Sequence, residues 1–166
     1  MENNPSNRGE VSTIEGKYLT FTLSQEEYGI GIKKIREIIR LVPITAIPEM
    51  PAYIKGVINL RGRVIPVVDL RLRFNMPEID YTERTCIVVV EMESADGHAT
   101  IGIVVDAVSE VMNIKAGDIE NTPEFGTRLN TDYILGLAKM GKGVKILLDI
   151  DRALSARDIS VLKSAD

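Results

Sequence analysis

The side chains that most often do chemistry in proteins are scarce in this chain. Its 166 residues include one histidine, His98, and one cysteine, Cys86. Nucleophilic catalysis needs a base beside the nucleophile, and a zinc site needs several cysteines or histidines at set spacings. His98 follows Asp96-Gly97, a pair typical of a tight hairpin, and Cys86 opens an apolar segment, which favours a solvated imidazole and an inert thiol. The sequence therefore predicts no catalytic site.

Carboxylates and glycines do not form a recognisable cofactor site either. Glu91, Glu93 and Asp96 lie near the same predicted hairpin, but they lack the ligand spacing of a calcium loop and indicate a solvated turn. The stretch Y-G-I-G-I at 28–32 has two glycines without a third, and no helix is expected after it, so it does not fit a phosphate-binding loop. We expect no cofactor, no metal and no enzymatic activity.

Charge is more informative than reactive chemistry. The net charge is −4 and the pI is near 5.2, which argues against a general binder of polyanions. Two interpretations stay open for the arginines of the first half, a solvated face or a patch that faces a partner, since arginine is enriched at interfaces. These arginines are Arg36, Arg40, Arg61, Arg63, Arg71, Arg73 and Arg84.

The segments expected to position these side chains occur twice in the sequence, as an internal repeat. Residues 53–70 run Y-I-K-G-V-I-N-L-R-G-R-V-I-P-V-V-D-L, and residues 133–150 repeat the pattern as Y-I-L-G-L-A-K-M-G-K-G-V-K-I-L-L-D-I. Residues 29–38 are echoed in the same way by residues 102–111. A repeat of this size predicts two similar modules, and because domains of about 70 to 80 residues are marginal alone, the modules should share an interface.

The two copies differ at one predicted turn in a way that suggests function. Between the strands expected at 56–60 and 64–70, the first copy has Arg61 where the second has Gly141. Divergence at an otherwise repeated turn indicates a task that only one half performs. Arg61 is therefore the arginine to single out.

Short apolar segments separated by turn residues predict a mainly β protein, as small barrels or a sandwich. In 18–23 the alternation places Leu19, Phe21 and Leu23 on one face. Residues 35–40 suit either a helical turn or a strand, because their spacing fits a helix while β-branching favours a strand. The other expected strands are 28–32, 56–60, 64–70, 86–92, 99–105, 107–112, 133–137 and 144–150.

The ends of the chain are predicted to differ from its centre. Residues 1–15 are polar and rich in Pro, Gly and Asn, and we expect a disordered tail there. Residues 113–130 show no clear periodicity and are expected to form a loop. A helix should close the chain at 151–163, capped by Asp149 or Asp151.

Two predicted strands are apolar on both faces. They are I-V-V-V at 87–90 and V-I-P-V-V at 64–68, and strands of this kind need cover on both sides. We expect the sister module to cover one part and a binding partner the rest, because contiguous apolar surface usually marks an interface. Pro66 lacks the N–H for a ladder, which places it at an edge or a bulge.

Nothing in the sequence predicts secretion or insertion into a membrane. The N-terminus lacks the apolar core of a signal peptide, and no apolar run approaches the ~20 residues of a membrane span. The single cysteine excludes an intrachain disulfide and fits a reducing compartment. We expect a cytoplasmic protein.

Four longer stretches are specific enough to compare with known families. They are Y-G-I-x-I-x-x-I-x-E-I-I at 28–39, P-x-x-P-A-Y-I-K-G-V-I-N-L-R-G-R-V-I-P-V-V-D-L-R at 48–71, G-I-V-V-D-x-V-S-E-V at 102–111 and P-E-F at 123–125. Together they resemble the chemotaxis coupling (adaptor) protein family, CheW, in a similarity that runs from Tyr18 to Leu162.

The resemblance implies a specific fold and domain organisation. Two SH3-like five-stranded β-barrel subdomains, related by the internal duplication, would surround a shared core, with short helices and a C-terminal helix. The CheW-like domain would cover 16–166, with repeats at about 17–80 and 84–155. An exchange of strands between the two barrels stays open.

The resemblance also implies a function. It suggests a non-catalytic adaptor that links the cytoplasmic signalling tip of chemoreceptors (methyl-accepting chemotaxis proteins) to the regulatory domain of the histidine kinase CheA. We therefore expect these two partners, in receptor arrays on the inner face of the membrane and without direct membrane insertion. A pilus-type or other non-flagellar chemosensory pathway stays open.

Two other functional classes fit the sequence less well. A nucleic-acid-binding barrel would need aromatic side chains beside its arginines, where this chain offers only Tyr53 and Phe74, so we expect no nucleic acid. A small hydrolase would need the base and the nucleophile that the sequence does not supply.

The resemblance assigns a receptor-binding groove to the junction of the two barrels. Its apolar members would take a receptor helix, while Glu37 and Arg61 would set the orientation by charge. Ile32 and Val108 could equally belong to the core, and the kinase-contact residues are not assigned. The matching receptor-binding residues are Ile32, Ile35, Glu37, Ile38, Arg61, Cys86, Val108, Ser109 and Val111.

Overall fold

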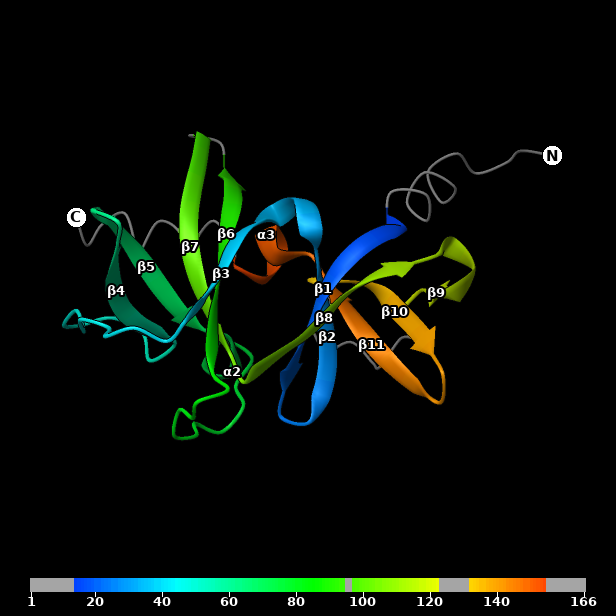
Figure 1. The fold of residues 1–166 in the computed structure, drawn as a ribbon, viewed down its shortest axis with the longest axis horizontal. Helices are drawn as coiled ribbons and strands as arrows, with labels where there is room; N and C mark the ends of the chain where they lie inside the picture. Colours follow the sequence, from blue (N-terminus) through cyan, green and yellow to red (C-terminus); the bar gives the residue numbers. More distant parts are fainter. Residues whose placement is uncertain (1–13, 95–96, 123–131, 155–166) are drawn as a thin grey trace.

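Two β-sheets lie side by side in the computed structural model, which describes residues 14–94, 97–122 and 132–154 (Figure 1). Sheet I has five strands in the order β3-β6-β7-β5-β4, and sheet II has six in the order β8-β1-β2-β11-β10-β9. The mainly β fold class predicted from the sequence is confirmed. Within the described residues, no helix has both the length and the apolarity needed to cross a bilayer.

The strands are short, and four single helical turns lie between or after them. The helical turns are η1 (Ile32–Lys34), α2 (Leu70–Arg73), η2 (Ala116–Asp118) and α3 (Ile150–Ala153). The strands are β1 (Gly16–Leu23), β2 (Glu26–Gly31), β3 (Ile35–Arg40), β4 (Ile54–Leu60), β5 (Arg63–Asp69), β6 (Cys86–Ser94), β7 (Gly97–Val105), β8 (Ala107–Ile114), β9 (Ile119–Glu120), β10 (Ile134–Met140) and β11 (Gly143–Leu148).

Each sheet takes strands from both halves of the duplicated sequence. β1 and β2 lie in the first repeat but pair with β8 and β11 of the second. In the same way, β6 and β7 of the second repeat pair with β3 and β5 of the first. In the described part of the chain, the polypeptide passes from sheet II to sheet I at residues 31–35, the first crossover, and returns at 105–107, the second crossover.

Three clusters of buried side chains hold the sheets together. The smaller two lie within the individual sheets, and the shared core lies between them. Alternation along β6 sends Ile87 and Val89 into the sheet I cluster and Val88 and Val90 into the shared core. The expectation that a partner covers one face of 87–90 is therefore wrong, because these side chains are at most 1% exposed within the chain itself.

The sheets are not the closed five-stranded barrels that were expected, although an SH3-like arrangement is retained. β3 and β4 form the two edges of sheet I, and only one backbone bridge outside the named strands, Thr45 with Val57, crosses this open side in the described residues. Sheet II gains a sixth strand because residues 119–120, predicted as loop, pair with β10. An additional two-residue strand cannot be recognised from periodicity.

The structure also decides some of the other local predictions. Residues 35–40, which suited helix or strand, form β3. Asp149 caps α3 by accepting a hydrogen bond from the Arg152 amide at 3.3 Å, while residues 155–163 of the predicted closing helix lie outside the described residues. Residues 1–13 of the predicted tail also lie outside them.

Pro66 does not lie at an edge, because β5 runs between β7 and β4. It pairs with Val57 of β4, and the parallel ladder of β5 with β7 begins only at Val67. The edge alternative is wrong for the strand as a whole, but Pro66 lies next to the β4 bulge between Ile54 and Gly56, on a side where no ladder needs its N–H.

The turn between β4 and β5 has the backbone of a two-residue hairpin. Arg61 and Gly62 have φ angles of 51° and 88°, and the Asn59 side chain accepts a hydrogen bond from the Gly62 amide at 2.8 Å. Two successive positive φ angles are typical of a type I′ turn, whose twist matches that of the flanking strands. Gly141 provides the corresponding positive φ of 61° in the second copy.

Candidate functional site

Two edge strands carry most of the residues assigned to the site. β3 is an edge of sheet I and β8 an edge of sheet II, and they occupy equivalent places in the two repeats. Ile38 on β3 is 42% exposed, and its counterpart Val111 on β8 is 51% exposed. Apolar side chains on open strand edges favour contact with another chain. We call Ile32, residues 35–40 and residues 107–114 the edge-strand surface.

Each edge strand contains a β-bulge at the equivalent position. In β3 the register shifts between Ile35 and Glu37, and in β8 it shifts opposite Thr20 and Phe21 so that Ser109 is the extra residue. The Thr20 hydroxyl stabilises the second bulge, donating to the Glu110 carbonyl at 2.9 Å. Bulges re-aim side chains at sheet edges, and they gather near functional sites. These bulges could not be predicted from the apolar pattern, because a single unpaired residue leaves it almost unchanged.

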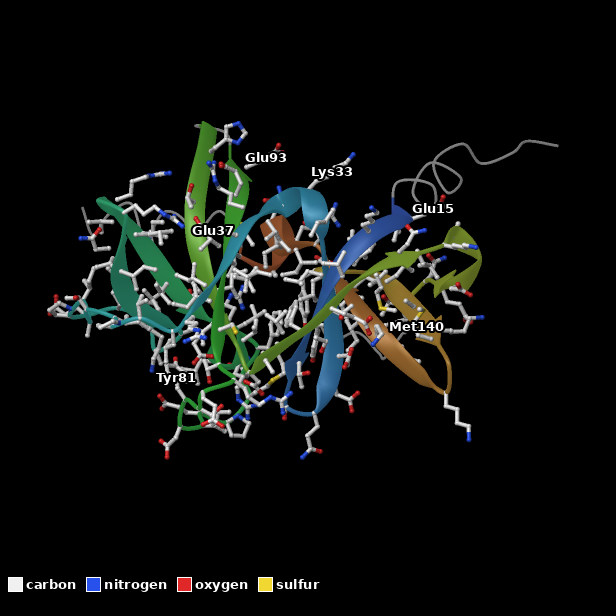
Figure 2. All side chains as sticks on the ribbon, viewed as in Figure 1. Glu15, Lys33, Glu37, Tyr81, Glu93 and Met140 are labelled. Atoms are coloured by element: carbon white, nitrogen blue, oxygen red, sulfur yellow. The ribbon has the colours of Figure 1, made fainter. Side chains whose placement is uncertain are left out.

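Glu37 and Arg61 form a bidentate ion pair on sheet I, where Figure 2 labels Glu37. Arg61 donates from Nη1 to Oε2 of Glu37 at 2.7 Å and from Nη2 to Oε1 at 2.6 Å. The pair connects edge strand β3 to the β4–β5 turn, across the side of sheet I that the backbone ladder leaves open. This fork geometry fixes both side chains more firmly than a single contact would.

The ion pair changes the titration of both groups. The hydrogen bonds from Arg61 lower the pKa of the Glu37 carboxyl, and the positive charges of Arg61 and Arg36 act in the same direction. The hydrogen bond to Glu37 raises the pKa of the Arg61 guanidinium. Arg61 also holds a positive φ where the second copy has glycine, as the type I′ turn requires. The bidentate bond to Glu37 singles out Arg61, as the sequence did.

Three of the assigned apolar residues are half-buried and pack on the shared core. They are Ile32, Ile35 and Val108, so they form a floor beside the more exposed Ile38 and Val111. The alternative that Ile32 and Val108 belong to the core is thus partly correct, since both pack on the core but remain partly exposed. A sequence pattern cannot separate a core residue from a surface residue at this junction, because the same side chain packs on the shared core and also lines the edge-strand surface.

Cys86 and Ser109 lie at the margins of this surface. Cys86 begins β6 opposite Arg40 of β3, is half-buried, and its thiol lies 3.4 Å from the Arg84 carbonyl. Ser109 is exposed, with its hydroxyl 3.4 Å from the Glu27 carboxylate of β2. The structure therefore joins Glu37 and Arg61 directly and leaves Ser109 on the other sheet.

The sequence reasoning missed a second pair of exposed apolar residues. Val64 on β5 is 70% exposed and Val144 on β11 is 46% exposed. The two valines occupy equivalent positions in the two repeats, and each lies beside a hairpin turn. Val64 belongs to the 64–68 segment for which partner cover was expected, but neither valine was included among the site residues.

The described residues offer little for reaction chemistry. No group of three or more His, Cys, Asp or Glu side chains in them is placed to hold a metal ion. His98 is exposed on β7, paired across the ladder with Glu93.

Open strand edges, exposed apolar anchors and a fixed charge pair together define a protein-binding module of the SH3-like type. A family model described as CheW-like domain matches residues 17–158. The chain belongs to the CheW-like family, as the sequence resemblance indicated.

Proteins of known name are similar over most of their length. The chain is 40% identical to the chemotaxis protein CheW of Klebsiella aerogenes over 150 residues, which cover 90% of this chain and 88% of that protein. It is 33% identical to the chemotaxis protein CheW of Bacillus subtilis over 156 residues, covering 94% and 95%. A solved structure, the scaffolding protein TtCheW from Thermoanaerobacter tengcongensis, superposes with a TM-score of 0.75 at 34% identity, covering 87% of this chain and 95% of that one.

These comparisons place the chain among the scaffold proteins of chemotaxis, which are non-catalytic. They favour a chemotaxis pathway over the pilus-type alternative, since the similar proteins carry chemotaxis in their names.

Proposed function

We propose that this chain couples chemoreceptors, the methyl-accepting chemotaxis proteins, to the histidine kinase CheA. The edge-strand surface takes the cytoplasmic signalling tip of the receptor, and a separate face, not yet assigned, takes the regulatory domain of the kinase. The complex lies in the cytoplasm, in receptor arrays on the inner face of the membrane. The observation that carries the proposal is the pair of exposed apolar residues, Ile38 and Val111, at equivalent positions of two open strand edges.

An apolar helix face suits this surface. A receptor tip that lays a helix between β3 and β8 would cover Ile38 and Val111 and rest on the half-buried Ile32, Ile35 and Val108. Because Ile38 and Val111 are about half exposed, their complete burial contributes about 1 kcal/mol each. Binding of moderate strength follows, which suits a scaffold whose contacts exchange.

The Glu37–Arg61 pair supplies orientation rather than strength. Arg61 keeps 69% of its side chain exposed and Glu37 31%, so both charges stay available to a partner. A pair that is already bonded presents one positive and one negative group at fixed positions. A partner with the complementary order of charges is favoured over the reversed one.

Separate binding measurements with the two partners test the proposal. A chemoreceptor signalling-tip fragment and a CheA regulatory domain are titrated into the full chain, as wild type and as Ile38→Asp or Val111→Asp. Each variant should weaken receptor binding roughly tenfold or more, as expected for an anchor residue, and leave kinase binding unchanged. Val144→Asp is the matched control, since it charges a comparably exposed valine outside the surface.

The outcomes separate the two halves of the proposal. Wild-type receptor affinity in both edge-strand variants would remove the receptor site from this surface. Loss of kinase binding together with receptor binding would show that the two partners share it. Binding of neither partner by the wild-type chain would overturn the proposed function.

A further inference from the structure

Two ion pairs tie the crossovers to the helical turns that follow the two repeated hairpins. Arg71 of α2 donates from Nη1 to Oδ2 of Asp106 in the second crossover at 2.7 Å. Lys34 of η1, in the first crossover, places its Nζ 2.7 Å from Oδ2 of Asp151 in α3. We call these pairs the lower tie and the upper tie, after the positions of α2 and α3 in Figure 1.

Each tie uses an aspartate to join the two sheets. Asp106 accepts a second hydrogen bond, at 2.8 Å, from the Ser24 amide in the turn between β1 and β2 of sheet II, while Arg71 follows β5 of sheet I. Asp151 follows β11 of sheet II and accepts, at 3.1 Å, from the Glu93 amide of β6 in sheet I. Figure 2 shows Glu93 and Lys33, the neighbour of Lys34, at the same end of the molecule.

The two ties are opposite in charge and match in the helical turn, while their crossover residues are offset by one position, since Asp106 corresponds to Lys33. Leu70 and Ile150 occupy equivalent positions in the two repeats, so Arg71 and Asp151, which follow them, are equivalent as well. The helical turn supplies the cation in the lower tie and the anion in the upper tie. Two such ties at separate points add to the shared core in resisting a change in the angle between the sheets.

The lower tie is the stronger constraint. The Arg71 side chain is 9% exposed and that of Asp106 is 20% exposed, against 27% and 33% for Lys34 and Asp151. Arg71 also donates from Nε to the Pro77 carbonyl at 3.0 Å, and the Asp106 amide donates to the Thr22 carbonyl at 3.1 Å. Removal of one partner from a pair this sheltered leaves the other charge without compensation.

Both ties lie immediately before the edge-strand surface. β3 begins one residue after Lys34, and Val108 lies two residues after Asp106. A rotation of one sheet against the other therefore changes the separation and angle between β3 and β8. We propose that Arg71 and Asp106, with Lys34 and Asp151 in support, are positioning residues that set the geometry of the receptor-binding surface from outside it. This inference rests on the proposed function.

Nuclear magnetic resonance on the full ¹⁵N-labelled chain measures the sheet orientation directly. Residual dipolar couplings of the amides should fit one alignment tensor for both sheets in the wild type. In Arg71→Met the two sheets should require different tensors, or one tensor with a changed angle between them. Arg71→Lys should recover most of the wild-type orientation, because it keeps the cation beside Asp106. Lys139→Met is the control, since Lys139 pairs with Glu120 inside sheet II at 2.7 Å.

Titration with a chemoreceptor signalling-tip fragment then connects orientation to binding. Arg71→Met should lower the affinity roughly two- to thirtyfold, the range expected for residues that act on a site through the structure, with partial rescue in Arg71→Lys. If Arg71→Met does not fold, Asp106→Asn replaces it, because the amide oxygen still accepts from Ser24 while the charge is lost.

The outcomes distinguish this inference from the function on which it rests. Unchanged couplings in the folded variants would refute the ties as the source of orientation. Altered couplings with unchanged receptor affinity would refute their role in positioning and leave the proposed function standing. Failure of the wild-type chain to bind the receptor tip would overturn the proposed function and the receptor half of this inference together.

Discussion

Replacement of Gly56 by alanine should be among the most damaging single-methyl changes in this protein. Gly56 lies in β4 at a register shift and has a φ of 139°. A Cβ atom built there would lie 1.9 Å from the Thr45 carbonyl oxygen, 2.7 Å from its carbon and 2.9 Å from the Ala46 Cα. All three are backbone atoms, so no side chain can rotate away. The segment that crosses β4 has to move.

The expected cost follows from what that movement breaks. Thr45 and Val57 exchange two backbone hydrogen bonds, of 2.8 and 2.9 Å, which are the described bridge across the open side of sheet I. Their loss costs about 2 kcal/mol, and a side chain at this φ adds about 1–3 kcal/mol of strain. The total of about 3–5 kcal/mol is a large share of the ~5–15 kcal/mol that typically stabilises a domain.

Urea unfolding followed by far-ultraviolet circular dichroism measures this loss, and it suits a chain without tryptophan. Gly117→Ala is the matched control, because no atom lies within 4 Å of its added Cβ and its φ is not in the positive region. The control should change stability by less than about 0.5 kcal/mol. A loss below about 1 kcal/mol in Gly56→Ala would refute the close approach of the two segments.

Three further changes probe the charge pair, the shared core and one half-buried tyrosine. Because hydrogen bonds from Arg61 lower the pKa of Glu37, the ion pair should persist as pH falls through the ordinary glutamate range near ~4.3 and be lost only below it. The ¹³C chemical shift of the Glu37 carboxyl follows this titration. In Arg61→Gly the pKa of Glu37 should move back up. Ile103→Ala should cost about 2–5 kcal/mol in urea unfolding, because this side chain is 0% exposed in the core between the sheets; loss of only one sheet's structure at the first transition would contradict a shared core. The pKa of Tyr81 is raised first by burial and then by the hydrogen bond from its hydroxyl to Asp69 at 2.7 Å. In an alkaline absorbance titration, Tyr81→Phe should therefore remove a late-ionising group. The same change should lower the free energy of unfolding by about 1–2 kcal/mol.

Repetition in the sequence predicted the features that depend on local chemistry. The turn at Arg61-Gly62, its counterpart at Gly141 and the helix cap at Asp149 are each decided by residues close together in the chain. The alternation of 18–23 likewise identified β1 and the inward face of Phe21, but the expectation of a single inward face is wrong, because Tyr18 and Thr20 on the other face are only 3% and 0% exposed. Such features require no knowledge of which strand pairs with which.

Partner choice between strands could not be obtained in this way. An apolar β2 looks the same whether it pairs with a strand of its own repeat or with β11, as it does here. The cover of 87–90 was divided between the sister module and a partner for the same reason, whereas the shared core buries Val88 and Val90 completely. The exposure of Ile38 is equally non-local, because it depends on β3 being an edge.

The candidate site was predicted through a resemblance more than through physics. Sequence reasoning alone selected Arg61, and the structure adds its bond to Glu37. The bulges beside Ile35 and at Ser109 carry no pattern, and their positions follow only from the completed ladders.

The interleaving of the repeats has a consequence for how the protein is made. Sheet I comes from one unbroken stretch, residues 35–105, and can assemble as soon as that stretch has left the ribosome. The hairpin of β1 and β2 emerges first but finds its second neighbour only when β11, ending at Leu148, has been synthesised. An isolated hairpin is at best marginally stable in water. This hairpin is synthesised before sheet I but is secured after it, and until then its apolar face is open to chaperones and to neighbouring copies on the same message.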